Sequence, residues 1–146
     1  MASQRDKKAL LVESEFLLGL RKGDRNHADV IRALHMHEKG SLGLRILSSA
    51  VIEVRAVLYS KGISFPNVED VISLMDAELD DFGVKSYVPT RLGDIVLSER
   101  LREEFPDLTF FDSLHAAISK RLGLSLLSND SVYNQVGAQA VRFGEL

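Results

Sequence analysis

The sequence predicts an α/β protein: a three-layer α/β/α sandwich with a central, mainly parallel sheet of about five strands. Two observations predict this fold. Short apolar runs typical of buried strands alternate along the chain with longer segments that have the spacing of amphipathic helices. That alternation is typical of parallel strands joined by helices that cover both faces of a sheet. Because the 146 residues contain no repeat, linker or low-complexity stretch, we expect one domain over residues 1–146.

Apolar runs and capping residues define the elements of the first half of the chain. KALLV at residues 8–12 has the composition of a buried strand, and a helix is expected to follow it. Gly40 is typical of a helix C-terminus, and Ser48 or Ser49 is expected to cap the third helix. The expected elements are strands at 8–12 and 44–47 and helices ending at about residue 21, at 28–38 and at 50–62.

Capping residues also divide the second half of the chain. Asn67 follows Pro66 and is expected to cap a helix with a clear apolar stripe. Thr90 and Thr109 are expected to cap the next two helices, the first of which stops before Pro106. The expected elements are helices at 67–83, 90–105 and 109–123, strands at 84–88 and 124–127, and a weaker strand at 140–143.

Composition excludes several classes of protein. Cysteine is absent, which excludes disulfides and thiolate metal sites and is typical of a reducing compartment. No apolar run approaches the roughly 18 residues that a membrane span requires, and the N-terminus lacks a secretory core, so we expect a cytoplasmic protein without a membrane partner. The net charge of −3 argues against a general nucleic-acid coat protein. GxGxxG and P-loop motifs are absent, which argues against nucleotide-binding Rossmann and NTPase folds.

Four acidic residues are expected near one edge of the predicted sheet. Glu13 directly follows the first strand, and Asp130 follows the fourth after two residues. Glu53 lies about one turn into the helix after the second strand, and Asp112 lies in the first turn of its own helix. Ligands of parallel sheets collect beyond the carboxyl ends of the strands, and Mg²⁺ and Mn²⁺ prefer oxygen ligands. The four acids are therefore candidate ligands of one or two divalent ions.

Each of these acids also has a local interpretation, which spacing alone leaves open. Glu13 fits a first-turn acid that complements a helix dipole, and Asp130 fits the N-cap of a short final helix. Asp112 stands three residues after Thr109, which is the spacing of a capping box. Glu53 is surrounded by apolar residues, so its alternative is a buried ion pair with an arginine.

Several segments together resemble PIN domains, particularly VapC-like toxins: SSAVIEVRAVL, FFDSLHAAISKRLG and LSLLSND, with KALLVES as the opening strand. The resemblance covers nearly the whole chain in order and implies a compact α/β sandwich with a central parallel sheet. It also implies a Mg²⁺- or Mn²⁺-dependent endoribonuclease, usually a homodimer, which in toxin members is inhibited by a small antitoxin protein. Carried over by position, the catalytic and metal-binding acids and their hydroxyl neighbours are Glu13, Glu53, Asp112 and Asp130, with Ser14 and Ser128.

The opening motif departs from that family. Members usually carry D-(T/S)-N or D-(S/T)-S where this chain has Glu13-Ser14-Glu15. Glutamate reaches one methylene further than aspartate, so its oxygens shift by more than the roughly 0.5 Å that a preorganised site tolerates. Glu15 adds a further negative charge. The alternative function is therefore a catalytically degenerate PIN domain that binds RNA or protein.

One histidine and one basic cluster lie near these motifs in the sequence. His115 stands three residues after Asp112, and we interpret it as a packing residue rather than as a zinc or manganese ligand. Arg21, Lys22 and Arg25 form a basic cluster, which is usually a solvated surface. If that cluster borders the acidic edge, its charges are placed to hold RNA phosphates.

A second family shares one local pattern with this chain. KALLVESE also resembles the opening of response-regulator receiver domains, in which paired acids bind Mg²⁺. A receiver needs a phospho-accepting aspartate at the end of its third strand and a lysine at the end of its fifth. LRILSSAVIEV supplies no aspartate and GAQAVRFGEL no lysine, so this alternative is disfavoured.

Overall fold

The structure, a computed structural model, describes residues 8–146 and contains a five-stranded parallel sheet in the order β3-β2-β1-β4-β5. Residues 1–7, part of the N-terminus considered for a secretory signal, lie outside the described residues. The chain order reverses at β1, because β2 and β3 lie on one side of it and β4 and β5 on the other. Such a reversal is where ligand crevices open in parallel sheets. The strands are β1 (Lys8–Val12), β2 (Leu42–Leu47), β3 (Tyr87–Val88), β4 (Ser125–Leu127) and β5 (Ala140–Val141).

The centre of the sheet is buried on both faces. Leu10, Leu11 and Val12 of β1 are all fully buried, although successive residues of a strand point to opposite faces. Val12 pairs with Ile46 on one side and with Leu127 on the other. The register therefore brings β1, β2 and β4 to an end at the same edge of the sheet, where any polar residue that follows is placed next to the others.

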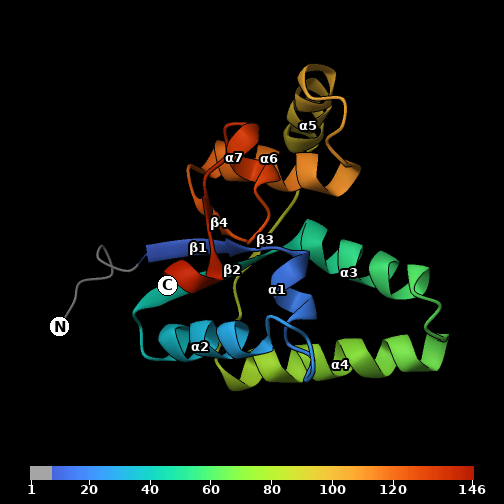
Figure 1. Cartoon of the computed structure of the whole chain (residues 1–146), viewed down its shortest axis with the longest axis vertical. Helices are drawn as coiled ribbons and strands as arrows, with labels where there is room; N and C mark the ends of the chain where they lie inside the picture. Colours follow the sequence, from blue (N-terminus) through green and yellow to red (C-terminus); the bar gives the residue numbers. More distant parts are fainter. Residues whose placement is uncertain (1–7) are drawn as a thin grey trace.

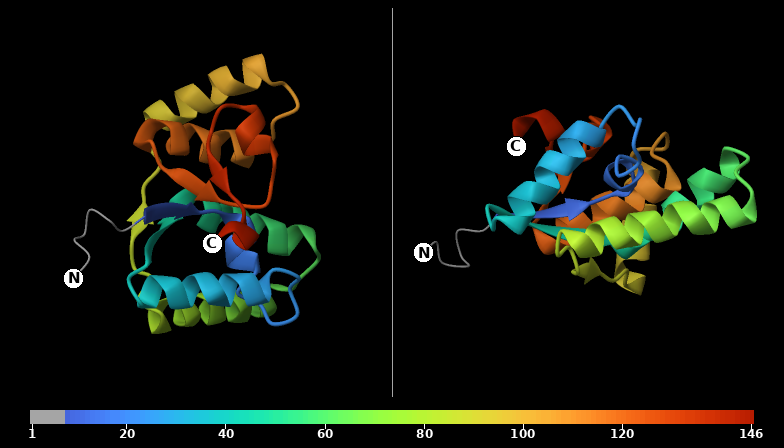
Figure 2. Two further views of the ribbon diagram at one scale, coloured as in Figure 1. Left: turned by 60° about the vertical axis from the view of Figure 1, so that its left-hand side comes forward. Right: turned by 90° about the horizontal axis from the view of Figure 1, so that it is seen from below.

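Helices cover both faces, so the predicted α/β/α sandwich with a parallel sheet is confirmed. Figures 1 and 2 show α5, α6 and α7 on one side of the sheet and α1, α2 and α4 on the other. α3 packs against α1, α4 and α6, on the side toward which β1 points (Figure 1). The helices are α1 (Ser14–Leu18), α2 (His27–Glu38), α3 (Ser48–Ser60), α4 (Phe65–Asp81), α5 (Leu92–Glu104), α6 (Phe110–Leu122) and α7 (Val132–Gln135), followed by the 3-10 helix η2 (Phe143–Glu145).

Three predicted helix ends were wrong, and one of them is the start of α5, where Arg91 rather than Thr90 is the N-cap. α1 ends at Leu18 rather than near residue 21, because the chain turns at Gly19 against α2; a Cβ there would lie 2.6 Å from a methyl group of Val30. α4 begins two residues earlier than expected, with Ser64 at its N-cap, so Asn67 is not the cap. A proline in the first helical turn is tolerated because its missing N–H would have had no helical partner.

The ends of α3 and α6 contrast in how well local signals predicted them. α3 follows Leu47 without a side-chain cap, and the Ser48 hydroxyl instead donates to the carbonyl of Val88 in the neighbouring strand. α6 agrees with its prediction: the hydroxyl of Thr109 accepts a first-turn N–H at 3.2 Å. Gly123 ends the helix with a left-handed φ of 65°, a conformation that glycine adopts without strain.

Among residues 8–146, the helices are all too short or too polar to cross a membrane.

Candidate metal centre

The first candidate acid lies at the junction of β1 and α1. Glu13 directly follows the buried end of β1 and occupies the N-cap of α1, where its Oε1 accepts the backbone N–H of Glu15 at 3.1 Å. It therefore has the local role that its position at a helix start predicts. Glu13 is nevertheless only 4% exposed, so its carboxylate faces protein atoms rather than solvent.

Glu53 of α3 is linked to this acid through Ser14. The Ser14 hydroxyl donates to Oε1 of Glu53 and lies 3.3 Å from Oε2 of Glu13. Because a hydroxyl has one proton, its donation to Glu53 leaves Oε2 of Glu13 without that proton, while Oε1 of Glu13 keeps the backbone N–H of Glu15. The alternative of an arginine ion pair for Glu53 is wrong for the part of the chain that the structure describes. The guanidinium of Arg55 instead lies 5.7 Å from the ring centroid of Tyr59.

Asp112 enters the site from the first turn of α6 and is held from behind by α7. The hydroxyl of Tyr133 donates to Oδ1 of Asp112 at 3.2 Å and lies 3.2 Å from Nδ1 of His115. Tyr133 and His115 are both fully buried. The other ring nitrogen of His115, Nε2, is buried without a hydrogen-bond partner in the described structure. These contacts fix the orientation of the Asp112 carboxylate.

The outer part of the site is formed after β4 and at the start of α1. Asp130 is exposed; its N–H donates to Ser128 Oγ at 3.1 Å, and its Oδ1 accepts the N–H of Val132 at 3.0 Å. Asp130 thus keeps the turn role that its position predicts. Glu15 accepts a hydrogen bond from Nδ2 of Asn26 at 3.3 Å and lies 3.5 Å from Ser128 Oγ. Ser128 therefore lies between the two outer acids.

Burial and mutual repulsion raise the pKa values of the inner acids. Burial is the main cause of the raised pKa of Glu13, and the charges of Glu15, Glu53 and Asp112 add to it. Burial also raises the pKa of Glu53 and that of Asp112, with smaller repulsion from Asp112 on the first and from Asp130 on the second. These couplings place the four acids predicted from the sequence in one continuous group, with Glu15 as a fifth member.

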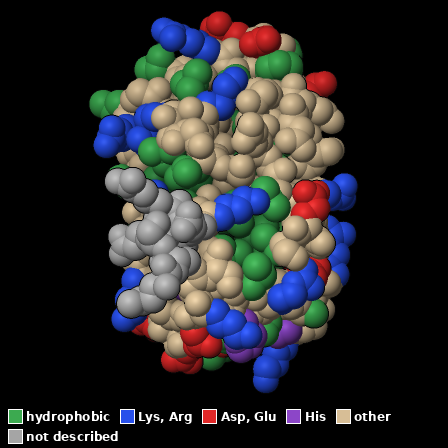
Figure 3. Space-filling model, turned by 90° about the vertical axis from the view of Figure 1, so that its left-hand side faces the viewer, with side chains coloured by type: hydrophobic (Ala, Val, Ile, Leu, Met, Phe, Trp, Pro, Cys, Tyr) green, Lys and Arg blue, Asp and Glu red, His purple; other side chains and the backbone are tan. Residues whose placement is uncertain are grey.

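Basic side chains reach only the outer part of this group in the described structure. Burial raises the pKa of Glu15, while nearby Arg25 opposes that increase and Asp130 adds to it. Arg21 and Lys22 lie in the same loop but form no ion pair with an acid of the site in the part of the chain that is described. On the face from which β1 starts, Lys and Arg are scattered among acids rather than gathered (Figure 3).

The inner residues fit a divalent cation. Glu13, Glu53 and His115 each offer one ligand atom, and these atoms lie within 4.8 Å of one another. No lysine or arginine of residues 8–146 forms an ion pair with Glu13, Glu53 or Asp112. A buried carboxylate without a cation is costly. Carboxylate oxygens are the ligands that Mg²⁺ and Mn²⁺ prefer, so the donor chemistry matches the expected ion.

Sequence reasoning did not identify two polar residues that support this centre. Tyr133 belongs to a short polar helix, VYNQ, and Asn26 lies in a segment whose sequence indicates only a connection. An aromatic residue in a polar segment indicates a side chain that packs in the core. The contact of the Tyr133 hydroxyl with Asp112, however, depends on how α7 packs on α6.

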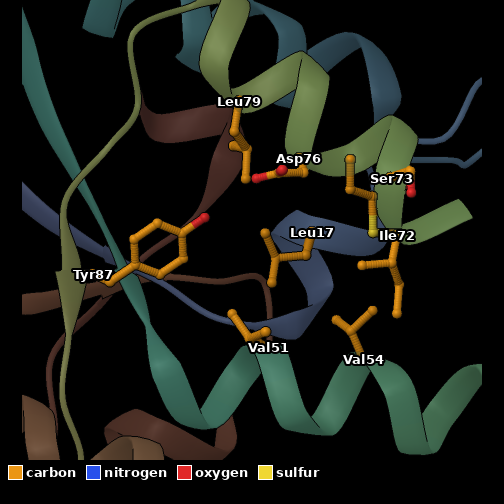
Figure 4. A pocket seen from close by; sticks show the side chains of 9 residues that line it. Leu17, Val51, Val54, Ile72, Ser73, Asp76, Leu79 and Tyr87 are labelled. Carbon is orange, nitrogen blue, oxygen red and sulfur yellow. The ribbon is translucent and has the colours of Figure 1, made fainter. Parts of the chain in front are cut away.

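A separate groove lies between α1, α3, α4 and β3 (Figure 4). It has a volume of about 210 Å³ and is lined mainly by apolar side chains, including Leu17, Val54 and Met75, with Asp76 and Tyr87 also facing it. None of the acids of the metal centre lines it. The groove offers apolar contact area rather than a group of ligands, so it is not a candidate metal site.

Comparisons with known proteins support the fold assignment. No family model matches the sequence, and no curated protein matches it. The structure is similar to VapBC2 from Rickettsia felis, solved bound to a DNA fragment from its promoter, with a TM-score of 0.69 at 14% identity over 92% of this chain and 98% of the other. It is also similar to VapC20 from Mycobacterium tuberculosis, a sarcin-ricin loop cleaving toxin, with a TM-score of 0.62 at 15% identity over 88% and 95% of the chains.

FitAcB from Neisseria gonorrhoeae gives a TM-score of 0.69 at 12% identity over 94% of this chain and 99% of the other. The similarity thus extends over nearly the full length of each protein. This chain has the fold of VapC-like PIN domains, as the sequence resemblance implied.

Proposed function

We propose that this chain, which has the VapC-like PIN-domain fold, is a divalent-metal-dependent endoribonuclease that hydrolyses RNA phosphodiester bonds. The proposal rests on one observation: Glu13, which is buried, and Glu53 and Asp112, which are partly buried, converge at the edge where β1 and β4 end, and none of the three has a basic ion-pair partner in the described structure. A structural neighbour is a sarcin-ricin loop cleaving toxin, which supports RNA as the substrate class.

We assign metal binding to four acids and the orientation of these acids to two serines. Glu13, Glu53, Asp112 and Asp130 are the proposed ligands of Mg²⁺ or Mn²⁺ or the groups that position the attacking water. When bound, the ion activates water and offsets charge that develops on the phosphate. Ser14 orients Glu53 through its hydrogen bond. The hydroxyls of Ser14 and Ser128 serve as supporting groups at the inner and outer ends of the site.

The basic loop after α1 is the proposed contact for RNA phosphates. The charge of Arg25 opposes the rise in the pKa of Glu15, which supports a position of this loop near the acidic edge. Arg21 and Lys22 belong to the same loop. Basic side chains around an acidic centre would hold the phosphate backbone of RNA beside the metal-binding acids.

Cleavage assays with Mg²⁺ and with Mn²⁺ test the function directly. Purified protein should cleave structured or single-stranded RNA, and Asp112→Asn should abolish cleavage while keeping the side-chain shape. Asp70→Asn, an exposed aspartate on α4, is the matched control and should cleave as the unmodified protein does. Cleavage that survives Asp112→Asn, or that survives chelation of divalent ions, removes this mechanism.

A degenerate PIN domain that binds RNA or protein is the second candidate, favoured by Glu13 and Glu15 at positions where the family usually has aspartate and a neutral residue. Calorimetry discriminates between the two functions. A degenerate module should bind no divalent ion near physiological concentrations, yet retain a protein or RNA partner. If Glu13→Asp creates nuclease activity where the unmodified protein has none, the degenerate function is favoured.

A toxin role adds a small antitoxin protein as a partner and a homodimer as the assembly. The Rickettsia felis neighbour is a VapBC2 structure with promoter DNA, which supports a toxin–antitoxin setting. Co-expression with the product of the neighbouring gene tests the partner: a complex should form and RNA cleavage should stop. Light scattering of the purified chain tests the homodimer.

The remaining proposals concern location and domain organisation. We expect the protein in the cytoplasm, where RNA is accessible, and residues 1–146 as one domain. Fractionation of cells tests the first, and limited proteolysis, which should leave no cut between β1 and β5, tests the second.

A further inference from the structure

His115 has an environment that packing alone does not account for. It is fully buried on α6, one turn after Asp112, and its Nε2 has no hydrogen-bond partner in the described structure. Buried polar atoms are nearly always paired, because an unpaired one has lost its hydrogen bonds to water without replacement. One ring nitrogen of His115 lies within 4.8 Å of carboxylate oxygens of Glu13 and Glu53, so the unpaired Nε2 of this ring points to a missing partner.

The hydrogen bonds behind His115 determine which nitrogen is free to bind. The hydroxyl of Tyr133 has one proton, which it donates to Asp112. With that proton used, the 3.2 Å contact between the Tyr133 hydroxyl and Nδ1 of His115 is a hydrogen bond only if the ring N–H donates to the hydroxyl oxygen. In a neutral imidazole with its proton on Nδ1, Nε2 carries a lone pair. Metal-binding histidines show this arrangement, in which the other ring N–H is held by a polar group.

The distances between ligand atoms of Glu13, Glu53 and His115 suit a single ion. Glu13, Glu53 and His115 offer ligand atoms that lie within 4.8 Å of one another. Three atoms bound to one ion at about 2.1 Å lie about 3.0–3.6 Å from one another. Side-chain shifts of up to about 1 Å therefore bring the three ligand atoms around one ion.

We propose that Nε2 of His115 is a direct metal ligand beside Glu13 and Glu53, and that this mixed site selects Mn²⁺, or a similar transition ion, over Mg²⁺. Imidazole binds first-row transition ions, whereas Mg²⁺ demands oxygen ligands. The proposal rests on the proposed function only in that both use the same ion. It assigns Tyr133 the role of holding the ring in the binding tautomer and of coupling His115 to Asp112.

Electron spin echo modulation of the Mn²⁺-loaded full-length protein tests the ligand directly. A bound imidazole nitrogen produces ¹⁴N modulation, which should be present in the unmodified protein and absent in His115→Asn. Asparagine is the sharpest substitution because its amide nitrogen replaces Nδ1 toward Tyr133 and supplies nothing at Nε2. In calorimetry, His115→Asn should weaken Mn²⁺ binding by at least about tenfold and should change Mg²⁺ binding by less than about threefold.

The chain provides a control that does not depend on folding of that variant. His27, His35, His37 and His115 are the four histidines of the sequence, and a variant with the first three changed to asparagine should keep the ¹⁴N modulation. Bound Mn²⁺ without ¹⁴N modulation in the unmodified protein overturns the His115 ligand, even if RNA is cleaved. Absence of both Mn²⁺ binding and cleavage overturns the proposed nuclease as well, so the two failures are distinguishable.

Discussion

The inner and outer ends of the acidic site differ in how their charge is balanced. At the inner end, Glu13 and Glu53 share one serine hydroxyl and have no basic partner in the described structure. At the outer end, Glu15 accepts a hydrogen bond from Asn26 and lies close to Arg25. The negative charge of the inner end is thus balanced by an added cation or removed by protonation, whereas the charge of the outer end is balanced by the protein and by solvent. We infer that the inner end is where the ion binds.

Glu13 and Glu15 provide a matched pair of substitutions for testing this difference, because they lie two residues apart and receive the same chemical change. Glu13→Gln should reduce RNA cleavage by at least about 10³-fold, since loss of a metal ligand removes several kcal/mol of transition-state stabilisation. Glu15→Gln should reduce it by less than about tenfold. Single-turnover cleavage with excess protein measures both, and equal losses would contradict the distinction between the two ends.

In the absence of metal, Glu13→Gln, the variant expected to lose more activity, should be the more stable of the two variants. Glu13→Gln removes a buried charge and keeps an oxygen to accept the N–H of Glu15, so it should raise the free energy of unfolding by about 1–2 kcal/mol at pH 8. Glu15→Gln should raise it by less, since Arg25 already offsets part of that charge. Urea unfolding with EDTA measures the two values. A destabilised Glu13→Gln variant would show that the cap outweighs the buried charge.

The gain in unfolding free energy from Glu13→Gln should depend on pH, in a direction that follows from the raised pKa of Glu13. The folded-state pKa of Glu13 is raised above its ordinary value of 4.5, chiefly by burial. Its contribution to stability is therefore fully present below the unfolded pKa and is lost as pH rises through the raised folded pKa. The difference in unfolding free energy between the variant and the unmodified protein should shrink as pH falls from 8 toward 5. A constant difference would place the carboxyl in an ordinary solvated environment.

The smallest expected effect concerns the basic loop at the outer end. Arg25→Gln should weaken metal-free RNA binding a few-fold and reduce the slope of log affinity against log salt by about 0.7, as expected for one lost phosphate contact. Arg100→Gln, an exposed arginine on α5, should leave the slope unchanged. Fluorescence anisotropy with labelled RNA across salt concentrations gives both slopes, and identical slopes would remove the loop from the RNA contact.

Local signals in the sequence determined the fold and the approximate place of the acids. The alternation of apolar runs and helical stripes predicted the parallel sheet, and Thr109 and Gly123 predicted both ends of α6. Glu13 and Asp130 follow strands that end at the same edge, so their neighbourhood follows from strand direction alone. Such signals act within a turn or a strand, which is the range over which a sequence pattern carries physical information.

Tertiary packing decided what these acids contact. Ser14 and Glu53 are 39 residues apart and meet only because α1 packs on α3. Tyr133 reaches Asp112 across 21 residues and also contacts His115, whose other ring nitrogen has no partner in the described structure. The local sequence also did not predict the N-cap of α4, which is Ser64 rather than Asn67. Burial, the absence of a compensating charge and the direction of a ring nitrogen depend on which surfaces meet, and no pattern along one segment contains that information.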